Sequence, residues 1–209
     1  MSSLAPQTGL PTDESLFERL RAGDEAAFLA LYRRRQGGIY RFALHMSGSA
    51  VLAEDITQEV FLALIRADSG YDPRRGALSG YLFGIARKLV LRHIERTRAD
   101  VALAPDSDDS ALSEISVTDD PMVDLTRRES IDALRHAIVT LPRRYREVVV
   151  LCDLDEVDYA AAARILECPV GTVRSRLHRA RALLLHKLLH NERGSRLAVG
   201  ALKPARCAI

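Results

Sequence analysis

The residues whose chemistry is most specific gather in a basic segment near the C-terminal end of the chain. Between residues 168 and 191 there is no acidic side chain. Helical spacing puts an apolar stripe on one side of this segment, made of Val173, Leu177, Ala180, Leu184 and Leu188. The opposite side carries Ser175, His178 and Arg179, with Arg174 at its edge. A helix with one buried side and with arginines and small polar groups on the other fits the major groove of DNA.

The sequence before this segment predicts a second, shorter helix. Asp158 is placed to cap a helix over residues 159–166, and Pro169 ends that helix and begins the next. A short helix, a three-residue break and a longer helix with polar residues at its start make a helix-turn-helix. For any single arginine, an ordinary amphipathic helix with solvated charges is the alternative, but the whole combination favours DNA.

A helix predicted over residues 50–67 has two sides that both carry apolar residues. One face is made of Ile56, Val60, Ala63 and Leu64. The opposite side mixes polar and apolar groups, namely Asp55, Gln58, Leu62 and Ile65. Such a mixture is typical of a protein interface, although burial on both sides would give the same pattern.

A loop over residues 69–79 and a helix over 80–97 interleave aromatic residues with cations. These residues are Tyr71, Arg74, Arg75, Tyr81, Phe83, Arg87, Lys88, Arg92 and His93. Single-stranded DNA fits this composition, because its bases stack on aromatic rings and its phosphates pair with cations. Phe83 and Tyr81 fit a hydrophobic core equally well.

The charge of the chain is unevenly distributed. Its 209 residues carry a net charge of only +2, but residues 99–124 hold eight acids and no Lys or Arg. The rest of the chain therefore has 30 basic and 20 acidic residues, a balance of +10. Basic ends joined by an acidic strap indicate a polyanionic partner, and the strap could cover the basic surface when that partner is absent.

The sequence predicts an all-α fold of two small helical domains joined by an acidic flexible linker. We expect a flexible N-terminus at 1–12, domains at 13–98 and 125–192, the linker at 99–124 and a flexible tail at 193–209. Asp24 is expected to cap one helix of the first domain, and Gly48 to end it. The three cysteines fit no zinc pattern and read as reduced thiols of a cytoplasmic protein, because no signal peptide or membrane-spanning run is found.

Taken in order, these segments resemble the extracytoplasmic function (ECF) sigma factors, group IV of the sigma-70 family. The resemblance covers about residues 13–190 and is carried by five motifs: DITQEVF, YDPRRG, YLFGIARK, LPRRYREVVVL and CPVGTVRSRLHRARALL. It implies sigma region 2 in the first domain and sigma region 4 in the second. Core RNA polymerase, promoter DNA in duplex and single-stranded form, and an anti-sigma factor are the implied partners.

The resemblance also assigns roles to single residues. Binding of the minus-35 duplex falls to Thr172, Arg174, Ser175, Arg176, His178 and Arg179. Recognition and melting of the minus-10 element fall to Tyr71, Arg74, Arg75, Tyr81, Arg87 and Lys88. Polymerase binding falls to Asp55, Gln58, Glu59 and Leu62. We expect Arg176 and Arg181 to pair with phosphates or with acids of their own domain. Neither residue lies at the centre of the helix face that carries Ser175, His178 and Arg179.

A few positions depart from the family pattern. The family usually has Trp where Tyr81 stands, Asn where Lys88 stands and an acid where Arg92 stands. These changes bear on the details of minus-10 contact. A run of alanines at 160–163 replaces a more usual Glu-Glu-Ile-Ala, so packing of that helix is expected to be looser.

Two other function classes compete with a promoter-specificity subunit. A free-standing helix-turn-helix regulator would need no second interface beside Asp55 and Gln58. An enzyme would need a catalytic site, and the sequence has no Gly-rich phosphate loop, nucleophile elbow or HExxH motif. His186 and His190 share a helix face, but no carboxylate or thiol near them in sequence completes a metal site. We therefore expect no catalytic residue, cofactor, metal, small-molecule substrate or membrane insertion.

Overall fold

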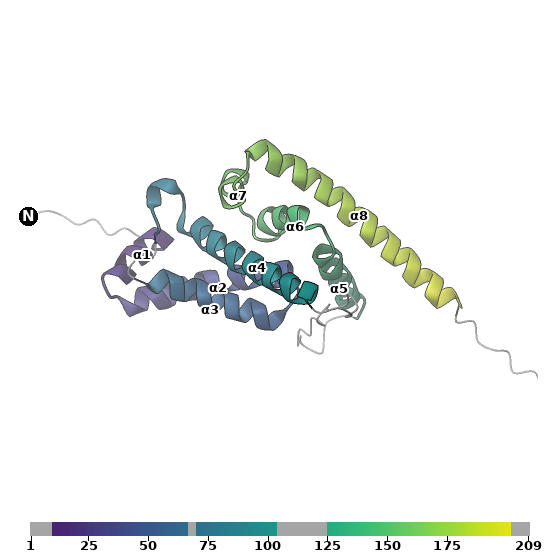
Figure 1. Cartoon of the computed structure of the whole chain (residues 1–209), viewed down its shortest axis with the longest axis horizontal. Helices are drawn as coiled ribbons and strands as arrows, with labels where there is room; N and C mark the ends of the chain where they lie inside the picture. Colours follow the sequence, from purple (N-terminus) through teal and green to yellow (C-terminus); the bar gives the residue numbers. More distant parts are fainter. Residues whose placement is uncertain (1–9, 67–69, 104–124, 202–209) are drawn as a thin grey trace, which may run out of the picture. The chain divides into compact units, whose positions relative to one another are not determined.

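The computed structural model describes residues 10–66, 70–103 and 125–201, and within these ranges the chain forms helices and no strand (Figure 1). Eight α-helices follow one another: α1 (Asp13–Arg21), α2 (Glu25–Ser47), α3 (Ala50–Ile65), α4 (Leu78–Leu103), α5 (Leu125–Val139), α6 (Arg143–Val149), α7 (Tyr159–Ile165) and α8 (Val170–Ala201). A 3₁₀ turn, η1 (Pro73–Arg75), precedes α4, and a π-helical segment, η2 (Val150–Leu154), follows α6. The predicted all-α class is confirmed.

The chain divides into two compact units. The first comprises Met1–Ala43 and Val51–Pro105, and the second comprises Leu44–Ala50 and Asp106–Ile209. Each unit has its own aliphatic core. None of the helices in the described residues is both long and apolar enough to cross a membrane.

Side-chain caps fix where the helices of the first unit begin. Thr12 accepts a hydrogen bond from the Ser15 amide at 3.2 Å, and Asp24 accepts one from the Ala27 amide at 3.1 Å, as expected for an N-cap. Gly48 ends α2 with a positive φ of 75°, which a residue without Cβ adopts at little cost. The core between the helices is made of Leu31, Ile39, Phe42, Ile56, Val60, Leu82 and Val90.

The short helix α1 is tied to two other helices of its unit. Asp13 is only 5% exposed and forms ion pairs with Arg34, at 2.9 Å, and with Arg35 of α2. The Glu14 side chain accepts a hydrogen bond from the Leu78 amide at 3.1 Å. By accepting from the first amide of α4, this carboxylate satisfies a backbone donor at the start of the helix, although it lies 64 residues away in sequence. The helix α4 begins at Leu78, two residues before the predicted start at residue 80.

The second unit builds the predicted helix-turn-helix. Asp158 caps α7 by accepting from the Ala161 amide at 2.8 Å, which confirms its predicted role. Glu167 turns the chain between α7 and α8 with a φ of 53°, and Pro169 precedes the first residue of α8. The core of this unit is made of Ile138, Leu141, Val148, Leu151, Ala162, Val173, Leu177 and Ala180.

Two helices continue past the boundaries that the sequence indicated. The helix α4 runs to Leu103, inside the predicted linker, because Pro105 is the first residue that disfavours helix there. The helix α8 runs to Ala201, inside the predicted flexible tail, and its isolated glycines are tolerated within a helix. Residues 99–103 of the predicted linker and residues 193–201 of the predicted tail are therefore helical in the structure. The predictions for residues 1–9, 104–124 and 202–209 lie outside the described residues.

Candidate nucleic-acid and protein interfaces

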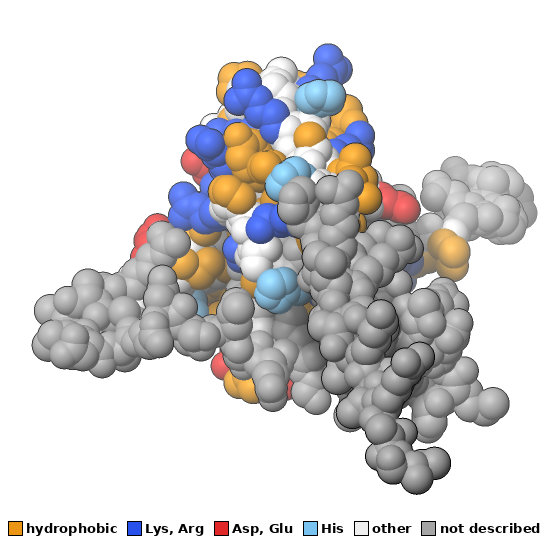
Figure 2. Space-filling model, turned by 90° about the vertical axis from the view of Figure 1, so that its right-hand side faces the viewer, with side chains coloured by type: hydrophobic (Ala, Val, Ile, Leu, Met, Phe, Trp, Pro, Cys, Tyr) orange, Lys and Arg blue, Asp and Glu red, His pale blue; other side chains and the backbone are white. Residues whose placement is uncertain are grey.

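The first turns of α8 place a buried stripe and a polar surface on opposite sides. Val173, Leu177 and Ala180 are buried against the rest of the second unit. Arg174, Ser175, His178 and Arg179 are exposed, and Thr172 and Arg176 are half-buried. Figure 2 shows Lys, Arg and His side chains around hydrophobic ones on the upper part of the face in view. Six predicted minus-35 residues thus lie within about two consecutive turns of one helix.

Most arginines of this surface have a partner within the second unit. The Arg181 guanidinium binds both carboxylate oxygens of Asp153 in η2, at 2.6 and 3.0 Å, and this pairing raises the pKa of Arg181. Arg181 therefore pairs with an acid of its own unit, which is one of the two kinds of partner that the sequence predicted. The Arg174 guanidinium lies 6.0 Å from the centre of the Tyr159 ring in α7. The Ser175 hydroxyl donates to the Thr172 carbonyl at 3.1 Å, which leaves its lone pairs free to accept.

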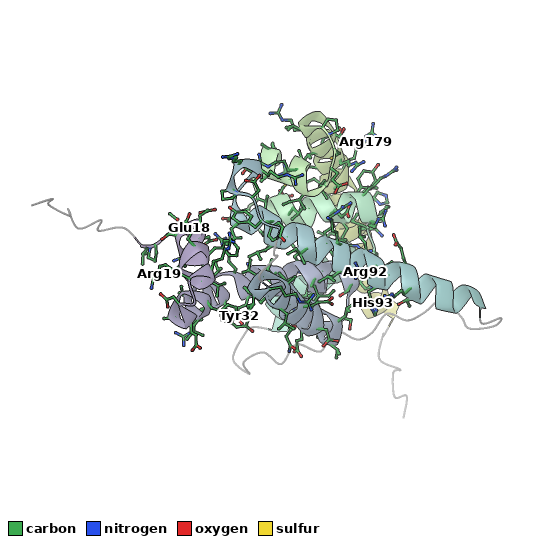
Figure 3. The ribbon with its side chains drawn as sticks, turned by 60° about the vertical axis from the view of Figure 1, so that its left-hand side comes forward. Glu18, Arg19, Tyr32, Arg92, His93 and Arg179 are labelled. Carbon is green, nitrogen blue, oxygen red and sulfur yellow. The ribbon has the colours of Figure 1, made fainter. Side chains whose placement is uncertain are left out.

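Arg179 contacts a residue that the sequence did not single out. The Arg179 guanidinium beside it lowers the pKa of the Tyr145 phenol in α6, and Arg144 lowers it further. The Arg144 guanidinium lies 4.8 Å from the centre of the Tyr145 ring. Arg179 lies near the start of α8 (Figure 3). The only sequence signal for Tyr145 was the Arg-Arg-Tyr-Arg run at residues 143–146.

The loop before α4 is held by its own hydrogen bonds. The Asp72 carboxylate accepts from the Arg74 amide at 2.9 Å and so caps η1. The Tyr71 hydroxyl donates to the Gly76 carbonyl at 3.1 Å and closes the loop across its ends. Arg74 and Arg75 are exposed at its tip. The loop therefore presents two guanidinium groups from a locally stabilised turn.

The aromatic residues of this region are partly used in packing. The Tyr71 ring lies 5.3 Å from that of Phe17 and 5.5 Å from that of Tyr81, centre to centre. Burial, reinforced by Glu14 and Asp13, raises the pKa of Tyr71. Phe83 is only 6% exposed and packs against Phe42, so it belongs to the hydrophobic core. Tyr71 and Tyr81 keep part of their surface accessible to a base.

Further cations follow along α4. Lys88 is exposed and Arg87 is half-buried. Arg92 and His93 are exposed one turn further along the same helix (Figure 3). The predicted minus-10 residues are therefore divided between the loop at 70–77 and the first three turns of α4.

The helix α3 has the two contrasting sides that its sequence predicts. Ile56, Val60 and Leu64 are buried. Asp55, Gln58 and Glu59 are exposed together with Leu62 and Ile65, which are 55% and 50% exposed. Burial on both sides is thereby excluded within the first unit.

The exposed α3 stripe has one member, Val51, that was not among the predicted residues. Val51 is 70% exposed and lies seven residues before Gln58, on the same side of the helix. The seven-residue spacing from Gln58 is the sequence signal that could have identified Val51. Among the side chains that the structure describes, no three His, Cys, Asp or Glu residues gather as metal ligands.

Comparison with protein families finds two matches along the chain. Residues 31–99 match sigma-70 region 2, and residues 131–184 match sigma-70 region 4. The first match covers α3, the loop at 70–77 and most of α4, and the second covers the helix-turn-helix.

Curated relatives cover most of the chain. The ECF RNA polymerase sigma factor SigW of Bacillus subtilis is 32% identical over 180 residues, which span 82% of this chain and 94% of SigW. The ECF RNA polymerase sigma-E factor of Escherichia coli K12 is 33% identical over 187 residues, which span 85% and 94% of the two chains. SigE of Mycolicibacterium smegmatis is 34% identical over 180 residues, but the match spans only 66% of that longer protein.

Two solved structures share the fold. CnrH, in complex with the cytosolic domain of CnrY, superposes with a TM-score of 0.62 at 23% identity, covering 84% of this chain and 96% of CnrH. RpoE, in complex with the anti-sigma factor NepR from Bartonella quintana, gives a TM-score of 0.59 at 22% identity, covering 83% and 91%. At these levels of sequence identity, the structural similarity shows that the three chains share a fold.

Proposed function

The chain belongs to the ECF sigma factors of the sigma-70 family, and we propose on this premise that it directs core RNA polymerase to specific promoters. The observation that carries the proposal is the first turns of α8. There, exposed Arg174, Ser175, His178 and Arg179 lie opposite a buried stripe, directly after the capped helix α7. This arrangement supports readout of a minus-35 element in the major groove.

The first unit supplies the second DNA contact. Exposed Arg74 and Arg75, half-buried Tyr71, Tyr81 and Arg87, and exposed Lys88 support binding of the minus-10 element as a single strand. Cations pair with phosphates, and the accessible parts of the two tyrosine rings stack with unpaired bases. The unit thereby favours the melted form of the promoter.

The exposed side of α3 is the proposed polymerase contact. Asp55, Gln58 and Glu59 lie among Val51, Leu62 and Ile65, so polar groups that fix orientation are surrounded by apolar surface. The match to sigma-70 region 2 across this helix favours a promoter-specificity subunit over a free-standing regulator.

Three further assignments complete the proposal. An anti-sigma factor is the inferred regulatory partner, since CnrH and RpoE are solved in complex with the cytosolic domain of CnrY and the anti-sigma factor NepR. The chain acts in the cytoplasm, where RNA polymerase works. It is not an enzyme itself and requires neither a cofactor nor a small-molecule substrate.

In vitro transcription with purified core polymerase tests the function directly. Core enzyme plus this chain is expected to give run-off transcripts from a subset of a promoter library, and core enzyme alone is expected to give none. The Asp55→Ala, Gln58→Ala double variant should bind core about thirtyfold more weakly, as for loss of an interface hot spot of about 2 kcal/mol. Unchanged core affinity of a folded double variant contradicts the α3 assignment, and absence of transcripts with the wild-type chain contradicts the function.

A further inference from the structure

We propose that Glu14 is a positioning residue for promoter opening, because its hydrogen bond to the Leu78 amide fixes where the loop at 70–77 joins α4. This role rests on the proposed function of that loop and comes from a residue that is not itself assigned to DNA. The helix that carries Glu14, α1 (Asp13–Arg21), also precedes the part of the chain that matches sigma-70 region 2, which begins at residue 31.

One face of α1 contacts both ends of the loop. Glu14 and Phe17 are three residues apart, so their side chains lie on the same side of the helix. The Glu14 carboxylate accepts from the Leu78 amide at 3.1 Å, directly after the loop. The edge of one ring meets the face of the other where Phe17 packs on Tyr71 at the start of the loop, with 5.3 Å between ring centres. The exposed tip of the loop therefore lies between two points of attachment to α1.

The Leu78 amide depends on an acceptor from outside its own helix. Leu78 is the first residue of α4, and the first amides of a helix have no carbonyl partner within it. Leu78 is also fully buried, at 0% exposed, so water is a poor substitute for the Glu14 carboxylate. Without that carboxylate, we expect the first turn of α4 to loosen and the end of the loop to move with it.

The helix α1 is a firm support because it is fixed to α2. Asp13 is 5% exposed and forms ion pairs with Arg34, at 2.9 Å, and with Arg35 of α2. The Arg34 guanidinium also donates to the Pro11 carbonyl at 2.8 Å, just before α1 begins. Leu16 is 1% exposed and anchors the helix in the core. Contacts thus run from α2 through α1 to the loop.

The contacts from α1 and the bonds within the loop have different effects. The bond from the Tyr71 hydroxyl to the Gly76 carbonyl maintains the shape of the turn, whereas α1 determines where the turn lies relative to α4. Tyr81 lies in the first turn of α4, and its ring is 5.5 Å from that of Tyr71. A shift at Leu78 would change the separation of these two rings, which are proposed to stack with unpaired bases.

Two substitutions of Glu14 separate its acceptor from its charge. Both Glu14→Ala and Glu14→Gln remove the charge, but the glutamine oxygen can still accept from the Leu78 amide. In Glu14→Ala we expect solvent exchange of the Leu78 amide, measured by NMR on the full chain, to become about tenfold faster. Permanganate-detected opening of a duplex promoter by the holoenzyme should fall about three- to tenfold. Glu14→Gln should retain most of both properties.

Controls distinguish positioning from a general loss of structure. Glu18→Ala is the matched variant, because Glu18 is exposed on the same helix (Figure 3) and should affect neither exchange nor opening. Core polymerase should bind Glu14→Ala as tightly as the wild-type chain, and a promoter with a pre-melted minus-10 region should restore most of its activity. Weaker core binding, or no rescue by the pre-melted promoter, would mean that the variant is only misfolded and would overturn the positioning role.

The remaining outcomes separate this role from the function that it rests on. Unchanged Leu78 exchange in Glu14→Ala overturns it, and so does equal impairment of Glu14→Ala and Glu14→Gln. Normal opening by Glu14→Ala, while Arg74→Ala is impaired, also overturns the role of Glu14 but leaves the function of the loop intact. If Arg74→Ala itself opens the promoter normally, the proposed function of the loop fails, whatever Leu78 exchange shows.

Discussion

The two surfaces proposed to contact DNA are stabilised in different ways. On α8, two arginines face residues of other elements: Arg181 binds Asp153 in η2, and Arg174 lies 6.0 Å from the centre of the Tyr159 ring in α7. In the loop at 70–77, the hydrogen bonds are local, from the Arg74 amide to Asp72 and from the Tyr71 hydroxyl to the Gly76 carbonyl, although the Tyr71 ring also packs on Phe17 of α1. The recognition surface therefore depends on the packing of its unit, and the loop depends largely on its own hydrogen bonds.

This difference matches what each surface is proposed to do. Readout of duplex DNA depends on side chains fixed to within a fraction of an ångström of base edges, which a packed helix with supporting contacts provides. Binding of a single strand relies on stacking and phosphate contacts that tolerate more variation in position. Changes in the second unit should consequently alter sequence preference, and changes in the loop should alter promoter opening.

The largest effect is expected from the buried side of α8. Leu177 is 2% exposed, and Leu177→Ala should destabilise the second unit by about 2–5 kcal/mol, as for other buried leucines. Its neighbour His178 is exposed on the opposite side, so His178→Ala should leave stability unchanged and affect only DNA binding. Chemical denaturation followed by circular dichroism distinguishes the two, and equal stability of both variants would refute the assigned faces.

The next effect separates base readout from phosphate contact within the same surface. Arg174→Ala should remove about 1–3 kcal/mol of discrimination at one or two minus-35 positions. Arg176 is half-buried at the edge of the reading face, and Arg176→Ala should weaken all sequences equally, with a salt slope reduced by about one unit. Binding to single-base variants at two salt concentrations measures both, and a uniform loss for Arg174→Ala would disprove its reading role.

A smaller effect is expected in the loop. Asp72→Ala removes the cap of η1, a loss of about 1 kcal/mol for caps in general, and should reduce permanganate-detected opening of a duplex promoter. Asp153→Ala is the matched change beside α8, because it removes the acidic partner of Arg181. It should leave permanganate-detected opening of the bound duplex promoter unaffected. The comparison between the two surfaces fails if Asp72→Ala changes minus-35 preference instead.

The last prediction concerns reactivity rather than promoter use and reports on η2, the segment that carries the partner of Arg181. Burial raises the pKa of the Cys152 thiol in η2 to about 11, and neighbouring Asp153 adds to the shift. Since the thiolate is the reactive form, alkylation at pH 8 should be on the order of a hundredfold slower than for a free thiol and should accelerate as pH approaches the raised pKa. Mass spectrometry of the folded chain, with the denatured chain as control, measures this rate. Equal rates in the two states would mean that the thiol is not shielded.

Sequence reasoning was sufficient where the signal was local. Asp24 and Asp158 cap the helices that follow them, and the buried stripe through Val173 and Leu177 follows from helical periodicity. The two contrasting sides of α3 were predictable for the same reason. Each of these features is encoded within a few residues of where it acts.

Features that depend on distant residues could not be predicted in this way. The start of α4 is set by Glu14, which lies 64 residues before Leu78. The partner of Arg181 lies in a π-helical segment that no periodicity indicated. Packing between elements decides these contacts, and a single sequence carries little sign of it.

Transcription on two templates tests the central claim most directly, that one unit reads duplex DNA and the other favours the melted strand. Arg179→Ala and Arg74→Ala holoenzymes are compared on a duplex promoter and on the same promoter with a pre-melted minus-10 region. Both variants should be impaired on the duplex, and the pre-melted template should restore most activity to Arg74→Ala while Arg179→Ala stays impaired. Equal rescue of both variants, or rescue of neither, would contradict the division of roles between the two units.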